Sequence, residues 1–150
     1  MNGKLLGLLT LGLLLAATVA TARHEFERLG ANRMLYIAET QAGVLASQGP
    51  QQRQIAARNL AGLQRAHKAS PADPRIPHAI GSYYLLLDQL GQSEIWYRRA
   101  LELEPRAETY LTLARGLERR DKRDEAAELY RTAARLTPVL RQEVPAWVRE

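Results

Sequence analysis

The sequence predicts an all-α fold of antiparallel helical hairpins, and three observations support that prediction. Two stretches that end at Pro105 and Pro138 repeat each other at a spacing of 33 residues, and a period of this length is typical of stacked helical hairpins. Apolar side chains recur at helical spacing through most of the chain, and no alternating run of useful length predicts a strand. Short turns separate the segments, as antiparallel neighbours in a helical stack require.

The composition narrows the classes of protein to which the chain can belong. Its 150 residues suffice for one small domain, 46% of them are hydrophobic, and none is cysteine. The lack of cysteine excludes disulfides, thiol catalysis and thiolate metal sites. A net charge of +5 permits contact with anionic lipid or with an acidic protein surface. No basic motif with interleaved aromatic residues accompanies this charge, so no nucleic-acid partner is expected.

The first element, residues 1–22, is predicted to be a signal peptide or an N-terminal membrane anchor. Lys4 provides a short positive start, Leu5 to Leu15 is almost entirely apolar, and Ala20-Thr21-Ala22 has the small-x-small form that a signal peptidase accepts. The apolar stretch is also just long enough to cross a hydrocarbon core. Cleavage after Ala22 and retention as a single-pass anchor therefore both remain open. Either alternative places the body at the bacterial inner membrane or in the periplasm.

The charges that flank this segment indicate its orientation in a membrane only weakly. Arg23, Arg28 and Arg33 follow it, whereas Lys4 and the amino terminus precede it. Because positive charge favours the cytoplasmic side of a membrane, an anchored body that faces the cytoplasm is a third alternative. The Leu-rich start and the predicted cleavage site favour export.

The body that follows is predicted to contain six helices and a terminal cap. Gln48-Gly49-Pro50 and Ser70-Pro71-Ala72-Asp73-Pro74 end helices because Gly and Pro interrupt helical hydrogen bonding. Turns are expected at Leu90-Gly91-Gln92 and at Arg120-Asp121-Lys122. In chain order the predicted helices are 24–47, 51–69, 76–89, 92–103, 107–119 and 123–136, followed by a short capping helix within 139–150.

The helix predicted over 51–69 has two distinct faces. Ile55, Leu60 and Leu63 lie within one arc of the helix. The other side carries cations only, which are Arg53, Arg58, Arg65 and Lys68. Beside a membrane this face would contact anionic headgroups, with each cation contributing about 1 kcal/mol. A solvated helix face is the alternative interpretation.

The repeated segments resemble the tetratricopeptide repeat. That pattern places small residues where the two helices of a hairpin cross, aromatic or large apolar residues between them, and a proline at the end. The matching positions are Gly81, Tyr84, Ser93, Tyr97, Ala100 and Pro105 in one copy, and Ala114, Leu117, Ala126, Tyr130, Ala133 and Pro138 in the next. Small residues let helix axes approach closely, and aromatic rings fill the space between layers.

A third copy upstream is degenerate. Leu63, Ala66 and Pro71 align with Tyr97, Ala100 and Pro105, but the preceding helix does not align, and the tryptophan that usually opens the family's repeat is missing. We therefore expect the helix over 24–47 to pair with the helix over 51–69. The predicted division is a hairpin with a degenerate repeat over 23–71, two repeats over 74–138, and a cap over 139–150.

Residue types that commonly carry chemistry are scattered along the chain. His24, His67 and His78 are isolated and lack the spacing of metal ligands. No glycine-rich loop is present that could hold a phosphate. The sequence therefore predicts no catalytic residue, no metal site and no cofactor.

The resemblance implies that the protein binds another protein or peptide through a concave face built from the first helix of each hairpin. The residues expected on that face are Arg75, His78, Ser82, Glu108, Leu111, Arg115 and Arg119. The Lys and Asn with which some family members clamp a peptide carboxylate are absent, because His78 and Ser82 stand in their places.

These expectations combine into a predicted function. The chain would be a non-catalytic scaffold, extracytoplasmic and membrane-associated, that helps to assemble an envelope complex. The alternative is a small stoichiometric, membrane-bound accessory subunit of a larger enzyme or secretion complex. A retained helix with partners inside the bilayer would favour the second interpretation.

Overall fold

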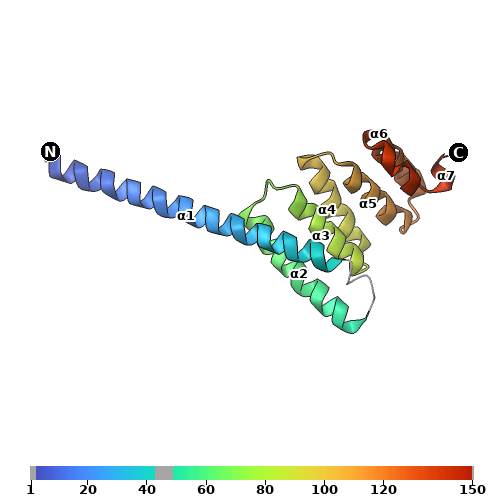
Figure 1. Ribbon diagram of the computed structural model, residues 1–150, viewed down its shortest axis with the longest axis horizontal. Coiled ribbons are helices and arrows are strands. Elements are labelled where there is room, and N and C mark those ends of the chain that lie inside the picture. The colour runs from blue at the N-terminus through green and yellow to red at the C-terminus, as the bar shows by residue number, and fades with distance from the viewer. Residues whose placement is uncertain (1–2, 43–48, 150) are drawn as a thin grey trace.

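The protein is an all-α stack of helical hairpins, as the sequence predicts (Figure 1). The structure, a computed structural model, describes residues 3–42 and 49–149, with the side chains of residues 11–38, 40 and 49–149. No strand occurs in these ranges. The helices are α1 (Gly3–Ala42), α2 (Pro50–Ala69), α3 (Arg75–Leu86), α4 (Leu90–Leu103), α5 (Ala107–Glu118), α6 (Arg123–Leu136), the 3-10 helix η2 (Pro138–Glu143) and α7 (Ala146–Arg149).

Local sequence chemistry accounts for where these helices begin and end. Pro50 stands in the first turn of α2, where its missing N–H costs no hydrogen bond, and His67 and Lys68 lie in the last turn. Asp124 and Glu125 in the first turn of α6 complement the positive end of its dipole. The small residues that the resemblance identifies lie at the helix crossings, where α3 packs on α4 and α5 packs on α6.

Two hydrophobic cores hold the stack together. The first joins the C-terminal part of α1 to α2 and α3, with Leu35, Leu63 and Ile80 among its buried members. The second joins α4 to the last hairpin and the C-terminal segment, with Tyr97 and Leu117 among its members. The C-terminal part of α1 thus pairs with α2 and completes the layer that the degenerate repeat leaves open.

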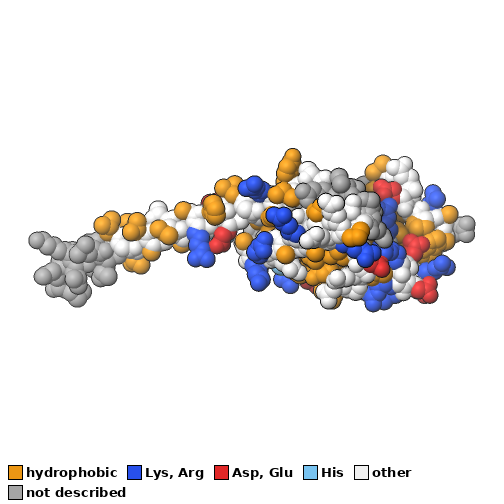
Figure 2. Space-filling view, turned by 90° about the horizontal axis from the view of Figure 1, so that it is seen from below, with side chains coloured by type: hydrophobic (Ala, Val, Ile, Leu, Met, Phe, Trp, Pro, Cys, Tyr) orange, Lys and Arg blue, Asp and Glu red, His pale blue; other side chains and the backbone are white. Residues whose placement is uncertain are grey.

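Helix α1 is longer than the helix predicted over 24–47, because it continues without a break through Ala22 and Arg23. Its N-terminal half extends away from the body (Figures 1 and 2). The side chains of Leu11, Leu13 and Val19 are between 61% and 71% exposed. Side chains of residues 1–10, which belong to the predicted leader, lie outside the described residues. No helix in the described part of the chain has both the length and the hydropathy that crossing a membrane requires.

The buried aromatic residues include one that the repeat pattern does not identify. Tyr97 and Tyr130 are each 1% exposed and occupy equivalent places in their hairpins. On α3, however, Tyr83 is fully buried, while Tyr84 lies half-buried and accepts a hydrogen bond from Gln64 Nε2 at 3.0 Å. Tyr83 shares the stripe of Ile76 and Ile80 that faces α1 and α2, so the orientation of α3 decides which tyrosine enters the core.

The turn between α3 and α4 differs from the prediction. We expected Leu90-Gly91-Gln92 to form it, but α4 already begins at Leu90. The chain reverses at Asp88, whose φ of 60° lies in the left-handed region, and Asp121 repeats this conformation with a φ of 61°. Aspartate tolerates that region better than most residues. The expected turn at residues 120–122 is present, and Gly91 lies inside a helix.

The C-terminal cap is a 3-10 helix followed by a single short α-helix. Pro145 separates the two because it cannot continue a helix from the preceding turn. Val144 and Val148 are buried against α6, whereas Val139 and Trp147 remain exposed. The predicted cap over 139–150 is thus present as two short helical segments, which pack through Leu140, Val144 and Val148.

Candidate partner-binding groove

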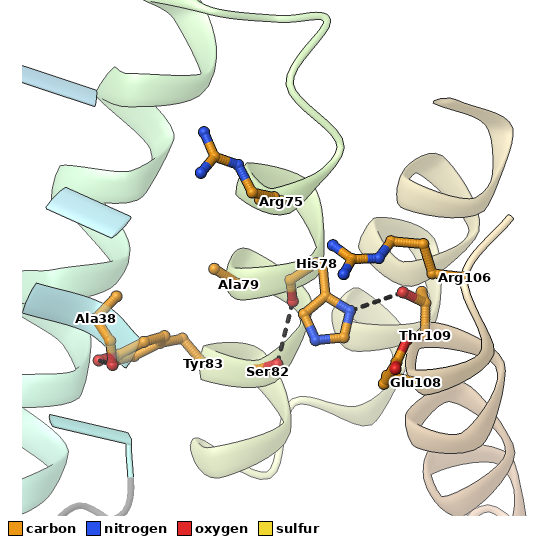
Figure 3. A pocket seen from close by; sticks show the side chains of 9 residues that line it. All are labelled: Ala38, Arg75, His78, Ala79, Ser82, Tyr83, Arg106, Glu108 and Thr109. Atoms are coloured by element: carbon orange, nitrogen blue, oxygen red, sulfur yellow. Dashed lines mark hydrogen bonds between the residues drawn. The ribbon is translucent and has the colours of Figure 1, made fainter. Parts of the chain in front are cut away.

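A cavity of about 500 Å³ opens on the face formed by α1, α3 and α5, which are the first helices of the three hairpins (Figure 3). Helices α1 and α3 lie side by side, as do α3 and α5. The cavity is lined by Ala38 of α1, by Arg75, His78, Ala79, Ser82 and Tyr83 of α3, and by Arg106, Glu108 and Thr109 at the start of α5. The resemblance implies a concave binding face on the first helices of the hairpins, and the cavity lies on these helices.

His78 is held at the centre of the cavity by neighbours on three elements. Its Nδ1 shares a hydrogen bond with Thr109 Oγ1 at 2.9 Å (Figure 3). Its ring meets Tyr97 edge to face, with the ring centroids 5.3 Å apart. Ser82 lies one turn further along α3, where its hydroxyl donates to the His78 carbonyl and also shares a hydrogen bond with the Tyr97 hydroxyl at 3.0 Å. These contacts fix the ring against α5.

The surroundings of His78 favour its uncharged form. Burial lowers the pKa of His78, and the Arg106 guanidinium lowers it further, while the Glu108 carboxylate acts in the opposite direction. The ring therefore has one donating and one accepting nitrogen near neutral pH. Burial likewise raises the pKa of the Tyr97 hydroxyl, which keeps it protonated as a donor.

Arg75 connects the rim of the cavity to α1. Its guanidinium donates to both carboxylate oxygens of Asp73 and to Asn32 Oδ1 of α1 at 3.0 Å. The hydrogen bond from Arg75 lowers the pKa of Asp73, against the opposing effect of burial. Arg75 thus orders the loop before α3 and ties it to the first hairpin.

Four of the seven residues predicted for partner binding line this cavity, and three do not. Arg75, His78, Ser82 and Glu108 lie together. Leu111 is 4% exposed and belongs to the second core. Arg115 pairs with Glu143 at 2.8 Å, and Arg119 pairs with Asp88 at 2.6 Å. Leu111 does not reach the cavity because the rotation of α5 about its axis turns this side chain into the second core.

Five lining residues were not predicted from the sequence, namely Ala38, Ala79, Tyr83, Arg106 and Thr109. Arg106 precedes α5 in an extended conformation, and such a loop position carries no helical periodicity. Thr109 is buried at 2% exposed, and only its hydrogen bond to His78 shows its role. Tyr83 closes the side toward α1, where its hydroxyl donates to the Ala38 carbonyl at 2.9 Å. Tyr83 follows Ile76 and Ile80 at helical spacing, so a signal for its burial was available in the sequence.

The cavity offers recognition chemistry. Arg106 and Glu108 supply opposite charges at its rim, and within the described part of the chain Arg106 forms no ion pair. The Thr109 hydroxyl orients the His78 ring through the hydrogen bond that the two side chains share. The residues that the structure describes contain no cluster of His, Cys, Asp or Glu able to hold a metal ion.

The predicted cationic face of α2 is present in the structure. Arg53, Arg58, Arg65 and Lys68 are all exposed. Among the described side chains, no carboxylate lies within ion-pair distance of any of the four. The face lies on the second helix of its hairpin, away from the cavity.

Comparison with known proteins supports the fold. No protein-family model matches the sequence, and no curated protein matches it. Among solved structures, TTC0263, a thermophilic TPR protein of Thermus thermophilus, superposes with a TM-score of 0.65 at 20% identity, covering 83% of this chain and 69% of that one. MamA superposes with a TM-score of 0.62 at 15% identity, covering 73% of this chain and 59% of MamA.

At these identities the likeness concerns the fold alone. This chain has the tetratricopeptide-repeat fold, which confirms the resemblance seen in the sequence. It spans less than two thirds of the MamA chain.

Proposed function

We propose that this fold serves as a non-catalytic scaffold that holds an extended segment of one partner protein in the cavity on α1, α3 and α5. The cavity itself is the observation that carries the proposal. Its volume of about 500 Å³ falls in the range of sites that enclose side chains of a ligand. Ala38 and Ala79 give it an apolar wall, while His78 and Ser82 supply polar groups that a peptide backbone can meet.

The charges at the rim indicate how the partner segment is oriented. Arg106 and Glu108 lie at the same end of α5. A carboxylate of the partner would pair with Arg106, and a backbone N–H or a cation would pair with Glu108. Because His78 is held neutral between Thr109 and Tyr97, it would contribute a hydrogen bond and not a charge.

The proposed setting is the bacterial envelope. The apolar first segment, with its predicted cleavage site after Ala22, supports an extracytoplasmic and membrane-associated body that helps to assemble an envelope complex. The cationic face of α2 would contact anionic lipid beside that membrane.

A second function, a stoichiometric accessory subunit, is favoured by one observation on α1. Its exposed apolar side chains extend past the predicted leader to Phe26, Leu29 and Tyr36, which are between 66% and 79% exposed. They lie on the side opposite Ala31 and Leu35, which pack on the body. A subunit of a larger complex would cover this stripe with another helix.

The test is a pull-down from mild-detergent extracts with the partner identified by mass spectrometry. The double swap Arg106→Glu with Glu108→Arg reverses the charges at the cavity and keeps the net charge constant. We expect it to reduce recovery of the partner about tenfold, because both charge pairs with the partner become repulsive. The N-terminal peptide in the same experiment shows whether residues 1–22 remain.

The matched control is the swap Arg58→Glu with Glu102→Arg. Both control residues are exposed and lie on second helices of their hairpins, outside the cavity. Partner recovery should match that of the unmodified chain. Equal recovery with both swapped proteins would overturn the groove as the binding site, and loss with the control alone would assign the partner to the other side of the stack.

A further inference from the structure

A second cavity lies at the C-terminal end of the stack, and every charged residue that lines it is an arginine. It has a volume of about 590 Å³ and lies where α6 meets the C-terminal segment. Its charged lining residues are four arginines, Arg131 and Arg135 of α6, Arg141 of η2 and Arg149 of α7. Three separate elements thus contribute arginines to the lining of one cavity.

These four arginines lack the ion-pair partners that several other arginines on the body have. Arg98, Arg115 and Arg119 each pair with a carboxylate. Among residues 3–42 and 49–149, no carboxylate lies within ion-pair distance of the four, and Arg135 Nη2 donates only to Thr132 Oγ1 at 3.3 Å. Like charges gathered in this way repel one another, so an anion placed among them would stabilise the arrangement.

The floor of the cavity is apolar. Val144 and Val148 are 4% and 5% exposed, and they pack beside Ala134 of α6. Pro145 allows this geometry because it ends η2 and lets α7 turn back, which brings both valines against the same helix. An apolar lining beside four arginines suits a ligand that carries an apolar side chain between negative charges.

We propose that this C-terminal arginine cavity docks an acidic segment of a partner protein, with an apolar side chain on the two valines and flanking carboxylates on the arginines. Guanidinium groups bind carboxylates through two parallel hydrogen bonds, which favours arginine over lysine at such a site. A peptide can place an apolar side chain in the cavity while its flanking carboxylates pair with the arginines that line it. The site is independent of the groove on α1, α3 and α5.

The probe for this proposal is a short fluorescein-labelled peptide in which a Leu-Phe pair is flanked on each side by Asp and Glu. Fluorescence anisotropy follows its binding to the full chain in mild detergent at low salt. We expect saturable binding that weakens about tenfold when Arg135→Gln and Arg141→Gln are combined, and that weakens as salt is added. Both residues are exposed, so these variants should fold.

Matched controls distinguish binding of the peptide in the cavity from a general attraction to the protein's net positive charge. Arg53→Gln combined with Arg58→Gln removes the same two charges from the face of α2 and should change the affinity less than about twofold. A peptide with Ser-Ser in place of Leu-Phe should bind about tenfold more weakly, since the valines would lose their contact. A peptide with Gln and Asn in place of the acids should not bind measurably.

The opposite results would overturn the proposal. Equal loss of affinity in the two double variants would mean that the peptide responds to net charge alone. Unchanged binding of the Ser-Ser peptide would show that the valine floor is not used. Inorganic phosphate and mixed micelles that contain phosphatidylglycerol are the competing probes. If these bind through Arg135 and Arg141 while the peptide does not bind, the cavity is a phosphate or lipid site instead.

Discussion

At the scale of single residues, the contact between Gly81 and Tyr97 sets the distance between α3 and α4. A Cβ atom added at Gly81 would lie 2.9 to 3.0 Å from three ring atoms of Tyr97. The Ser93 hydroxyl, which donates to the Gly81 carbonyl at 2.9 Å, holds the two helices at this spacing. In the next hairpin Ala114 and Ala126 stand at the equivalent positions, and Ala126 has no hydroxyl to donate.

We predict that Gly81→Ala destabilises the protein by about 1–2 kcal/mol. Overpacking of a tight contact costs about 1–3 kcal/mol, and the higher helix propensity of alanine offsets only part of that cost. The free energy of unfolding is measured by urea denaturation.

Gly116→Ala is the control for this change. Gly116 lies inside α5, and a Cβ there would meet only Leu85 Cδ1 at 3.9 Å, which is an ordinary contact. The control should be more stable than the unmodified chain by about 0.5–1 kcal/mol. If both alanine variants had the same stability, the ring of Tyr97 would not limit the approach of α3 and α4.

The same residues show what a sequence can predict at this scale. Gly81, Tyr97 and Pro105 were identified correctly because their spacing recurs in the chain. Arg106 and Thr109 were missed because a loop residue and a buried threonine leave no periodic signal. Leu111 was placed on the concave face, yet it is buried, because a carried-over pattern does not fix the rotation of α5.

At the scale of elements, Glu118 fastens the C-terminal segment to the last hairpin. Its Oε2 accepts a hydrogen bond from the Tyr130 hydroxyl at 2.8 Å, and its Oε1 accepts one from Trp147 Nε1 at 3.1 Å. The rings of Tyr130 and Trp147 also meet edge to face. Burial raises the pKa of Tyr130, and the adjacent Glu118 raises it further. One carboxylate thus joins α5, α6 and α7.

We predict that Glu118→Gln loosens α7 and lowers stability by about 1–2 kcal/mol. The amide keeps only one accepting oxygen, so one of the two hydrogen bonds to a charged group is lost. In a Trp96→Phe background, emission comes from Trp147 alone and should shift to longer wavelength as the indole becomes solvated.

Glu128→Gln on the exposed side of α6 provides the control and should leave the emission unchanged. An unshifted Trp147 spectrum in the Glu118→Gln protein would show that burial of Val144 and Val148 holds the segment without this carboxylate.

Helix boundaries were predicted well where a glycine or proline stands directly beside the helix end, and less well elsewhere. Gly49 and Pro50 mark the start of α2, and Pro105 follows α4 closely. Gly91 was misleading, because the chain reverses at Asp88 instead, where an aspartate adopts the left-handed conformation. The spacing of Asp88 and Asp121 matches the repeat, so this signal was available in the sequence.

At the scale of the whole molecule, the protein consists of a packed body and one projecting helix. The two cores bury residues from Ala31 onward. Helix α1 before that point makes no contribution to either core among its described residues, and its apolar side chains face solvent (Figure 2). The same helix therefore contains a segment held by tertiary packing and a segment held only by its own hydrogen bonds.

This division predicts a sharp change in amide hydrogen exchange along α1. Amides of residues 31–38 should be protected nearly as well as those of α3, because opening them requires loss of the first core. Amides of residues 11–29 should exchange at least about a hundredfold faster, since an isolated helix in water is marginally stable. Exchange measured by mass spectrometry in buffer resolves the two segments.

Adding detergent micelles should slow exchange only in residues 11–29, because micelles would cover the exposed apolar side chains and exclude water from them. Uniform protection along α1 in buffer would contradict the prediction and would mean that another molecule already covers the projecting segment.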